Sequence, residues 1–146
     1  MKFYESGDNR KPVIFLFPGT CCLYSSFDHV LDGLHSYFYT VAVSYDGFVN
    51  MFGIDKGGSP WITKQSVYNQ FYSDLVTKVQ HGIDVPGTTI HVFYATKMGK
   101  KYEKRYWTYF KNPDIRRHNM QHEELFCCHS AEWVEEVRKA VEGDRQ

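Results

Sequence analysis

The chain has 146 residues, and its 17 basic and 17 acidic side chains cancel to a formal net charge of zero at pH 7. A balanced chain without a long run of Lys and Arg is a poor candidate for nucleic-acid binding, so we expect no nucleic-acid partner. Aromatic residues make up 17% of the chain, which favours a packed domain with a cleft over a disordered tail. The length predicts a single domain spanning 1–146.

The N-terminal sequence and the cysteines indicate the cellular compartment of the protein. The first residues, MKFYESGDNRK, lack the apolar core and the cleavage site of a signal peptide. No stretch approaches the roughly 18 apolar residues of a membrane span, so we expect a cytoplasmic protein without membrane contact. The four cysteines form two adjacent pairs, Cys21-Cys22 and Cys127-Cys128. This spacing matches neither a zinc site nor a secreted disulfide framework, and it predicts reduced thiols and no bound metal.

The first part of the chain predicts two strands. Residues 2–6 read as a short strand at a sheet edge, followed by the turn-forming Gly7-Asp8-Asn9. Residues 13–17, VIFLF, are five consecutive large apolar residues, too few for a helix and too uniformly apolar for a half-exposed strand. They predict a buried, parallel-type strand at the centre of a sheet. Pro18-Gly19 ends that strand with a turn.

A helix and a further strand follow. Ser25 or Ser26 can cap a helix whose apolar residues recur at helical spacing. These residues are Phe27, Val30, Leu31 and Leu34. Residues 40–45, TVAVSY, are rich in β-branched and aromatic residues and predict the second core strand. The short connection predicts a right-handed crossover, with strand 40–45 parallel and adjacent to strand 13–17.

The middle of the chain changes character. Residues 49–60 contain three glycines and a proline without a sustained period, which indicates a loop. From Lys64 or Ser66 to about residue 81, a helix with one broad apolar face is predicted. That face consists of Val67, Tyr68, Phe71, Tyr72, Leu75, Val76 and Val79. Such a face needs a partner, which suggests a lid-like helix over about 64–81.

The last third of the chain alternates strands and helices. Residues 88–95 and 114–119 predict strands, and the basic, aromatic segment 97–110 between them predicts a helix. Ser130 caps a final helix, whose stripe is Trp133, Val134, Val137, Ala140 and Val141. The alternation predicts an α/β fold of three layers, built on a small, mostly parallel sheet of four or five strands flanked by helices.

Four motifs together resemble the α/β-hydrolase family: FLFPGTCC before a helix, VAVSYDGF, the late strand HVFYA, and MQHEELFCC before the last helix. The resemblance covers most of the chain. It implies that Gly19, Thr20 and Cys21 form the oxyanion loop and that Asp46-Gly47 forms the turn after the next strand. It also implies that His122 is the catalytic base.

The chain departs from this family at the nucleophile. The G-x-S-x-G elbow, which lifts a serine hydroxyl out of a strand-to-helix turn, is absent. The sequence most similar to this motif is Gly57-Gly58-Ser59-Pro60. However, no predicted strand precedes Ser59, and a proline follows it. We therefore infer an internal deletion near 48–50, so that the chain is a shortened hydrolase relative, a reduced α/β-hydrolase-like scaffold. The deletion is either natural or an artefact of a truncated gene prediction.

Two residue sets could restore part of the chemistry. Cys21 or Cys22, near a helix N-terminus, could act as the nucleophile in a Cys-His dyad with His122, although both cysteines are more simply small apolar fillers. Asp46 is available as the acid, but its position is that of a turn-forming residue. No cofactor is expected.

The sequence leaves several functions open. As a hydrolase-like protein the chain would act on small ester or acyl compounds, and without the nucleophile its catalysis would be impaired, as in a pseudoenzyme. The alternative is a non-enzymatic module that binds a small ligand or a protein partner. A third option is a homodimer that covers the apolar edges exposed by the deletion.

Overall fold

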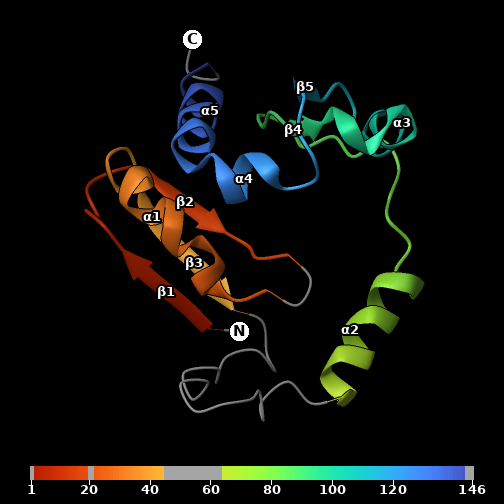
Figure 1. The fold of residues 1–146 in the computed structure, drawn as a ribbon, viewed down its shortest axis with the longest axis horizontal. Coiled ribbons are helices and arrows are strands. Elements are labelled where there is room, and N and C mark those ends of the chain that lie inside the picture. The colour runs from red at the N-terminus through yellow and green to blue at the C-terminus, as the bar shows by residue number, and fades with distance from the viewer. Residues whose placement is uncertain (1, 20–21, 45–63, 144–146) are drawn as a thin grey trace. The chain divides into compact units, whose positions relative to one another are not determined.

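A computed structural model of the protein describes residues 2–19, 22–44 and 64–143. The chain divides into two compact units, an N-terminal unit, Met1–Thr77, and a C-terminal unit, Lys78–Gln146. Each unit contains its own sheet (Figure 1). The inferred deletion near 48–50 and the predicted loop 49–60 lie outside the described residues. That the two units form a single domain stays a prediction.

The N-terminal sheet has three strands in the order β1-β3-β2. Strand β1, Lys2–Ser6, pairs antiparallel with β3, Tyr39–Ser44, and β2, Val13–Leu16, pairs parallel with β3. The predictions of an edge strand at 2–6 and of two parallel neighbours over 13–17 and 40–45 are therefore confirmed.

The central position in this sheet belongs to β3 and not to residues 13–17. Strand β3 has a partner on both sides, and its residues 40–44 are all buried. Strand β2 lies at the edge, with Val13 and Phe15 54% and 55% exposed. The prediction of a buried central strand at 13–17 is wrong, because burial depends on which strand gains two neighbours and not on apolar content alone.

Two consecutive helical segments pack against this sheet: the 3-10 turn η1, Tyr24–Phe27, and the helix α1, Asp28–His35 (Figure 1). Val30 and Leu34 of α1 are buried, as their spacing predicts. The predicted cap differs, because Ser26 Oγ donates to the Leu23 carbonyl over 2.7 Å and a 3-10 turn precedes the α-helix. The unit places α1 over the sheet face that carries Tyr4, whose ring stacks on Tyr24 at 3.7 Å.

Helix α2, Lys64–Val76, closes the N-terminal unit. It ends before residue 81, the predicted limit. The described apolar side chains of the predicted face are exposed: Tyr68, Phe71, Tyr72, Leu75 and Val76. No partner for this face is seen within the described part of the N-terminal unit, so its lid-like role stays a prediction.

The C-terminal unit is built on two parallel strands, β4, His91–Ala95, and β5, Asp114–His118. They are joined by η3, Thr96–Met98, and α3, Lys100–Tyr109. The helix predicted at 97–110 is interrupted at Gly99, whose φ of +96° is outside the helical range. Both strands begin and end close to their predicted positions.

Helices cover both faces of the β4-β5 pair. On one face Tyr94, which is 2% exposed, packs edge-on against Tyr106 of α3 and donates its hydroxyl to the Gly99 carbonyl over 2.7 Å. On the other face Arg116 donates to the Glu136 carbonyl over 3.2 Å. Glu136 belongs to α5, Ser130–Gly143, so the strand pair lies between α3 and α5.

The sequence predicts α5 correctly from Ser130 but misses the short helix before it, α4, Glu124–Cys128. Helix α4 contacts α5, and Phe126 meets Trp133 edge to face at a centroid distance of 5.2 Å. These two aromatic residues and the carboxyl ends of β4 and β5 frame the candidate site.

The fold is mixed α/β, as predicted, but its strands are distributed differently. The five described strands form a three-stranded and a two-stranded sheet, where one sheet of four or five strands was predicted. The difference follows from pairing: β3 takes a partner on each side, and β4 pairs with β5 through the α3 crossover. Two of the three pairings are parallel.

Candidate ligand pocket

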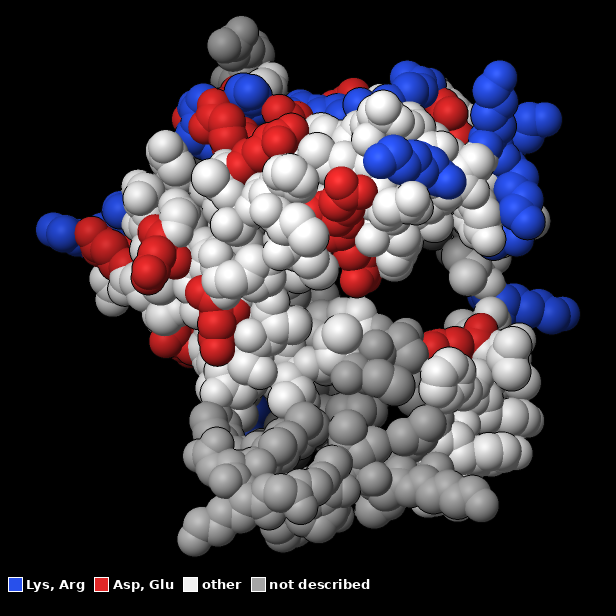
Figure 2. Space-filling model, in the orientation of Figure 1, with Lys and Arg blue, Asp and Glu red and all other residues white. Residues whose placement is uncertain are grey.

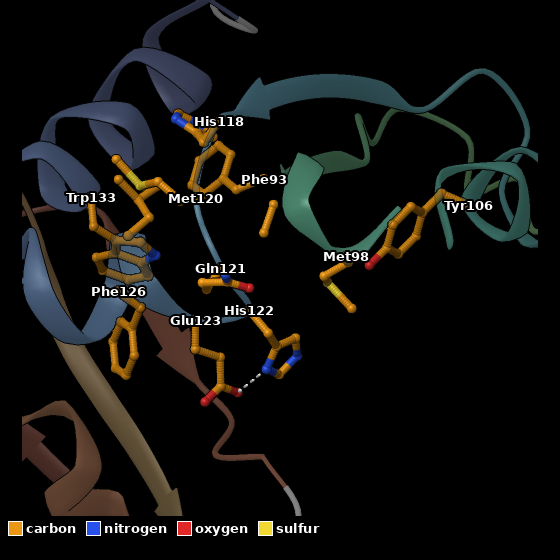
Figure 3. A pocket seen from close by; sticks show the side chains of 12 residues that line it. Phe93, Met98, Tyr106, His118, Met120, Gln121, His122, Glu123, Phe126 and Trp133 are labelled. Atoms are coloured by element: carbon orange, nitrogen blue, oxygen red, sulfur yellow. Dashed lines mark ion pairs between the residues drawn. The ribbon is translucent and has the colours of Figure 1, made fainter. Parts of the chain in front are cut away.

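A pocket opens in the C-terminal unit at the carboxyl end of the β4-β5 pair (Figure 3). Its volume is about 190 Å³. Ala95 and His118, the last residues of the two strands and direct neighbours in register, line it together with the segments that follow each strand. The carboxyl edge of parallel strands is where open α/β sheets place their ligands. The position therefore favours a binding site.

Most of the lining is apolar and comes from several elements. The side chains are Phe93, Met98, Tyr106, Met120, Leu125, Phe126 and Trp133. In Figure 3 Phe126 and Trp133 lie together on one side and Met98 and Tyr106 on the other. Aromatic rings and methionines bind apolar groups through dispersion, and methionine adapts its shape to the ligand. The walls suit the apolar part of a small molecule.

A short polar segment, Gln121-His122-Glu123, lies between these walls (Figure 3). The His122 and Glu123 side chains are 66% and 61% exposed, and His122 Nδ1 lies 4.0 Å from Glu123 Oε1. An ion pair this exposed contributes little to stability. Both groups are thus available to a ligand at the mouth of the pocket.

Hydrogen bonds hold this polar segment in place. The Lys97 amide donates to the Met120 carbonyl over 3.2 Å, and the Gln121 amide donates to Glu124 Oε2 over 2.6 Å. The second bond closes the turn just before α4, whose N-cap residue, Glu123, makes no side-chain capping hydrogen bond. Glu123 has a φ of +60°, a left-handed backbone that costs an L-residue about 1–2 kcal/mol. Such conformations cluster at functional sites.

His118 is the one lining residue with a buried polar atom that lacks a hydrogen-bond partner among the described residues. This atom is Nε2, and the ring packs edge-on against Phe93 at a centroid distance of 6.0 Å. Leaving a buried nitrogen without a partner costs roughly 1–3 kcal/mol. The ring therefore serves as a wall that retains unused hydrogen-bonding capacity.

The lining has acid-base groups but no serine, threonine, cysteine or lysine among its described residues. It contains two imidazoles, one carboxylate and one amide. Cys127 and Cys128 of α4 are exposed and lie outside the lining. The pocket can bind a ligand, but covalent catalysis by a serine, threonine, cysteine or lysine would need that residue from elsewhere.

The residues predicted for the oxyanion loop and the acid are only partly described. Thr20, Cys21 and Asp46 lie outside the described residues. The Cys22 amide donates to the Gly19 carbonyl over 3.0 Å, and Cys22 is a half-buried free thiol. Gly19 and Cys22 belong to the N-terminal unit and His122 to the C-terminal unit. The Cys-His dyad and the oxyanion loop stay predictions.

The sequence singled out His122 but missed the rest of the pocket. Phe126, Trp133 and His118 were assigned to a motif, a helix stripe and a strand without a binding role. Trp133 belongs to the α5 stripe but is only half-buried. Helix α4 has only five residues, too few for a helical period to show in the sequence.

Basic side chains gather over α3, as Figure 2 shows. Several are already engaged: Arg105 lies 5.0 Å from the ring centre of Tyr102, and Arg117 of β5 pairs with Glu103. This arrangement is that of a solvated amphipathic helix, in which aliphatic stems cover aromatic rings. It adds no polar group to the pocket.

Among the described residues, no group of three or more His, Cys, Asp or Glu is placed to hold a metal ion. In the same part of the chain no helix combines the length and apolar character needed to cross a membrane. No protein-family model, curated protein or solved structure matches the chain.

Proposed function

We propose that the protein binds a small amphipathic molecule in the pocket of its C-terminal unit. The observation that carries this proposal is the combination of apolar walls with an exposed polar segment, at the carboxyl edge of parallel strands. A pocket of this kind is the usual form of a ligand site: mostly apolar, with a few polar groups that fix orientation.

The volume limits the size of the ligand. At about 190 Å³ the pocket is smaller than the roughly 300 Å³ at which sites for drug-sized ligands begin. It is slightly larger than a cavity of about 150 Å³ that holds benzene. The fitting ligand has one ring or two small fused rings, or an aliphatic group of similar size, and one polar group.

The polar group of the ligand should donate a hydrogen bond. Glu123 offers a carboxylate, and Gln121 offers an amide oxygen on the same segment. With the ring between Phe126 and Met98, the polar group of the ligand would meet this segment (Figure 3). The ligand class is therefore a compact compound of one ring or two small fused rings with an N–H or O–H, and indole is the probe that we use for it.

Ligand binding is tested by saturation-transfer NMR with indole, for which we expect a dissociation constant on the order of 1 mM. Ala95→Leu fills the pocket from β4 and should abolish the transfer. Trp107→Phe, on an exposed residue of α3, should leave it unchanged. Equal transfer in the wild type and in Ala95→Leu would overturn the proposal.

A second candidate is the ester or acyl hydrolysis implied by the resemblance to the three-layer α/β-hydrolases. One observation favours it: His122 follows the last described strand and precedes the C-terminal helices, as the family's base does. Its reaction requires the two units to bring a nucleophile to His122. Catalytic turnover of p-nitrophenyl acetate that His122→Ala abolishes would support hydrolysis, and a rate equal to that of buffer would exclude it.

A further inference from the structure

A serine, a histidine and a threonine meet in the N-terminal unit, away from the residues assigned so far. Ser6 Oγ lies 3.0 Å from His35 Nε2 and 2.7 Å from Thr40 Oγ1. Thr40 Oγ1 is itself 3.1 Å from His35 Nε2. Ser6 ends β1, His35 ends α1, and Thr40 is the direct partner of Ser6 in β3. A serine hydroxyl within hydrogen-bond reach of an imidazole is the geometry of an activated nucleophile.

One proton arrangement makes Ser6 a donor to the imidazole and leaves the 3.1 Å contact between Thr40 Oγ1 and His35 Nε2 without a hydrogen bond of its own. The Thr40 hydroxyl donates to the Ser6 carbonyl over 3.2 Å or to Ser6 Oγ. The Ser6 hydroxyl then donates to His35 Nε2, with the imidazole in its Nδ1-protonated tautomer. Thr40 is fully buried, so it holds Ser6 from the protein side, while Ser6 and His35 are half-buried. The serine is both oriented and within reach of a reagent.

The position of His35 is fixed by its surroundings. Gly7 has a φ of +94°, and a Cβ there would lie 2.9 Å from His35 Cδ2 and 3.3 Å from the Phe38 carbonyl oxygen. Only glycine allows the backbone after Ser6 to pass this close to the ring. Lys11 Nζ donates to the His35 carbonyl over 2.6 Å and ends α1 there. The imidazole is thus held before any reagent arrives.

We propose that Ser6 is a reactive nucleophile with His35 as its general base, and that it accepts an acyl group from activated esters. In the step, Ser6 Oγ attacks the ester carbonyl carbon and its proton passes to His35 Nε2. The new Oγ–C bond forms and the bond to the leaving oxygen breaks. That oxygen takes up the proton held by His35, which yields acyl-Ser6, the free alcohol or phenol, and a neutral His35. The site is independent of the ligand pocket and of His122.

The test is covalent labelling of the full chain with p-nitrophenyl acetate, followed by tryptic mass spectrometry. Trypsin releases Phe3–Arg10, FYESGDNR, in which Ser6 is the only serine, and fragmentation separates it from Tyr4. We expect acetyl-Ser6 to form in the folded chain at least about tenfold faster than in the urea-unfolded chain, since general-base catalysis contributes about 10²–10⁴-fold. Equal rates in the two states would overturn the proposal.

Three variants separate activation from simple exposure. Ser6→Ala should remove the label from the peptide, and His35→Gln should slow labelling at least about tenfold. Thr40→Val removes the hydroxyl that orients Ser6 but leaves the Ser6–His35 bond, so labelling should slow, and by less than in His35→Gln. Full labelling in His35→Gln would contradict the assigned base, and a folded Thr40→Val protein that loses more labelling than His35→Gln would contradict the assigned serine–histidine pair.

The experiment is distinct from the tests above. Acetylation of Ser6 should be unchanged in His122→Ala and in Ala95→Leu, because neither residue belongs to the N-terminal unit. Failure of ligand binding with intact labelling, or the reverse, would therefore identify which of the two proposals is wrong.

Discussion

Glu123 combines three features in one residue: it lines the pocket, it has a left-handed backbone, and its carboxylate is exposed beside His122. A glycine would adopt that backbone without steric cost, whereas an alanine would keep the cost and lose only the carboxylate. The conformation places His122 and Glu123 at the mouth of the pocket, because the chain must bend there to enter α4. The left-handed backbone of Glu123 thus places both polar side chains where a ligand can reach them.

Glu123→Gly should stabilise the protein by up to about 1 kcal/mol, because relief of the left-handed conformation exceeds the added entropy of the unfolded chain. Glu123→Ala should be neutral or slightly destabilising, since the exposed ion pair contributes little. Urea unfolding of both variants measures the difference. A lower midpoint for Glu123→Gly than for Glu123→Ala would be inconsistent with strain at this position.

At the scale of elements, the β4-β5 pair is held at its start as well as at its pocket end. Asp114 Oδ2 lies 2.8 Å from His91 Nδ1 and 3.0 Å from Arg116 Nε, and Arg116 reaches Glu136 of α5. The hydrogen bond with His91, with a further contribution from Arg116, lowers the pKa of the Asp114 carboxyl below its ordinary value. This network connects both strands to α5.

A carboxyl whose pKa is lowered by folding stabilises the protein above its unfolded-state pKa, about 3.9 for Asp, and loses that contribution as the pH falls through the folded-state value. Asp114→Asn should therefore lower the free energy of unfolding at pH 6, by less than about 1 kcal/mol for so exposed a group. The deficit should vanish near pH 2. Asp32→Asn, on an exposed position of α1, is the control. A deficit that is the same at both pH values would contradict the role of this network.

The sequence predicted an element well where the apolar period extends over several turns. It failed where the length of the element is short or where neighbouring strands determine burial. Helix α5 was predicted from Ser130, because its stripe recurs over several turns. Helix α4 has only five residues, too few to show a period. Strand β2 was expected at the centre, because an apolar run reports burial but not the number of neighbouring strands. For the pocket, His122 was predicted from a motif, while Trp133 was indistinguishable from a core residue.

At the scale of the whole molecule, the division into two units has a direct consequence. The boundary at Thr77–Lys78 lies in an exposed segment between α2 and the first bridge of the C-terminal unit, at Ile83. Exposed segments with few backbone bonds are the usual sites of proteolytic cleavage. The hydrogen bonds that pair β4 with β5 are internal to the C-terminal unit.

Limited digestion with trypsin should cut after Lys78 earlier than after Lys101 or Arg117, which lie within α3 and β5. A fragment beginning at residue 79 should persist in the time course, as identified by mass spectrometry. If Lys101 or Arg117 is cut as fast as Lys78, the C-terminal unit is not a compact body of its own.

The most direct test of ligand binding uses the tryptophans as reporters. In protein labelled with 5-fluorotryptophan, indole should shift the ¹⁹F resonance of Trp133, which lines the pocket, in a saturable manner. The resonance of Trp107, which is 53% exposed on α3, should stay in place. A Trp133 resonance that does not move up to several times the expected dissociation constant of about 1 mM, or that moves in parallel with Trp107, would contradict the account.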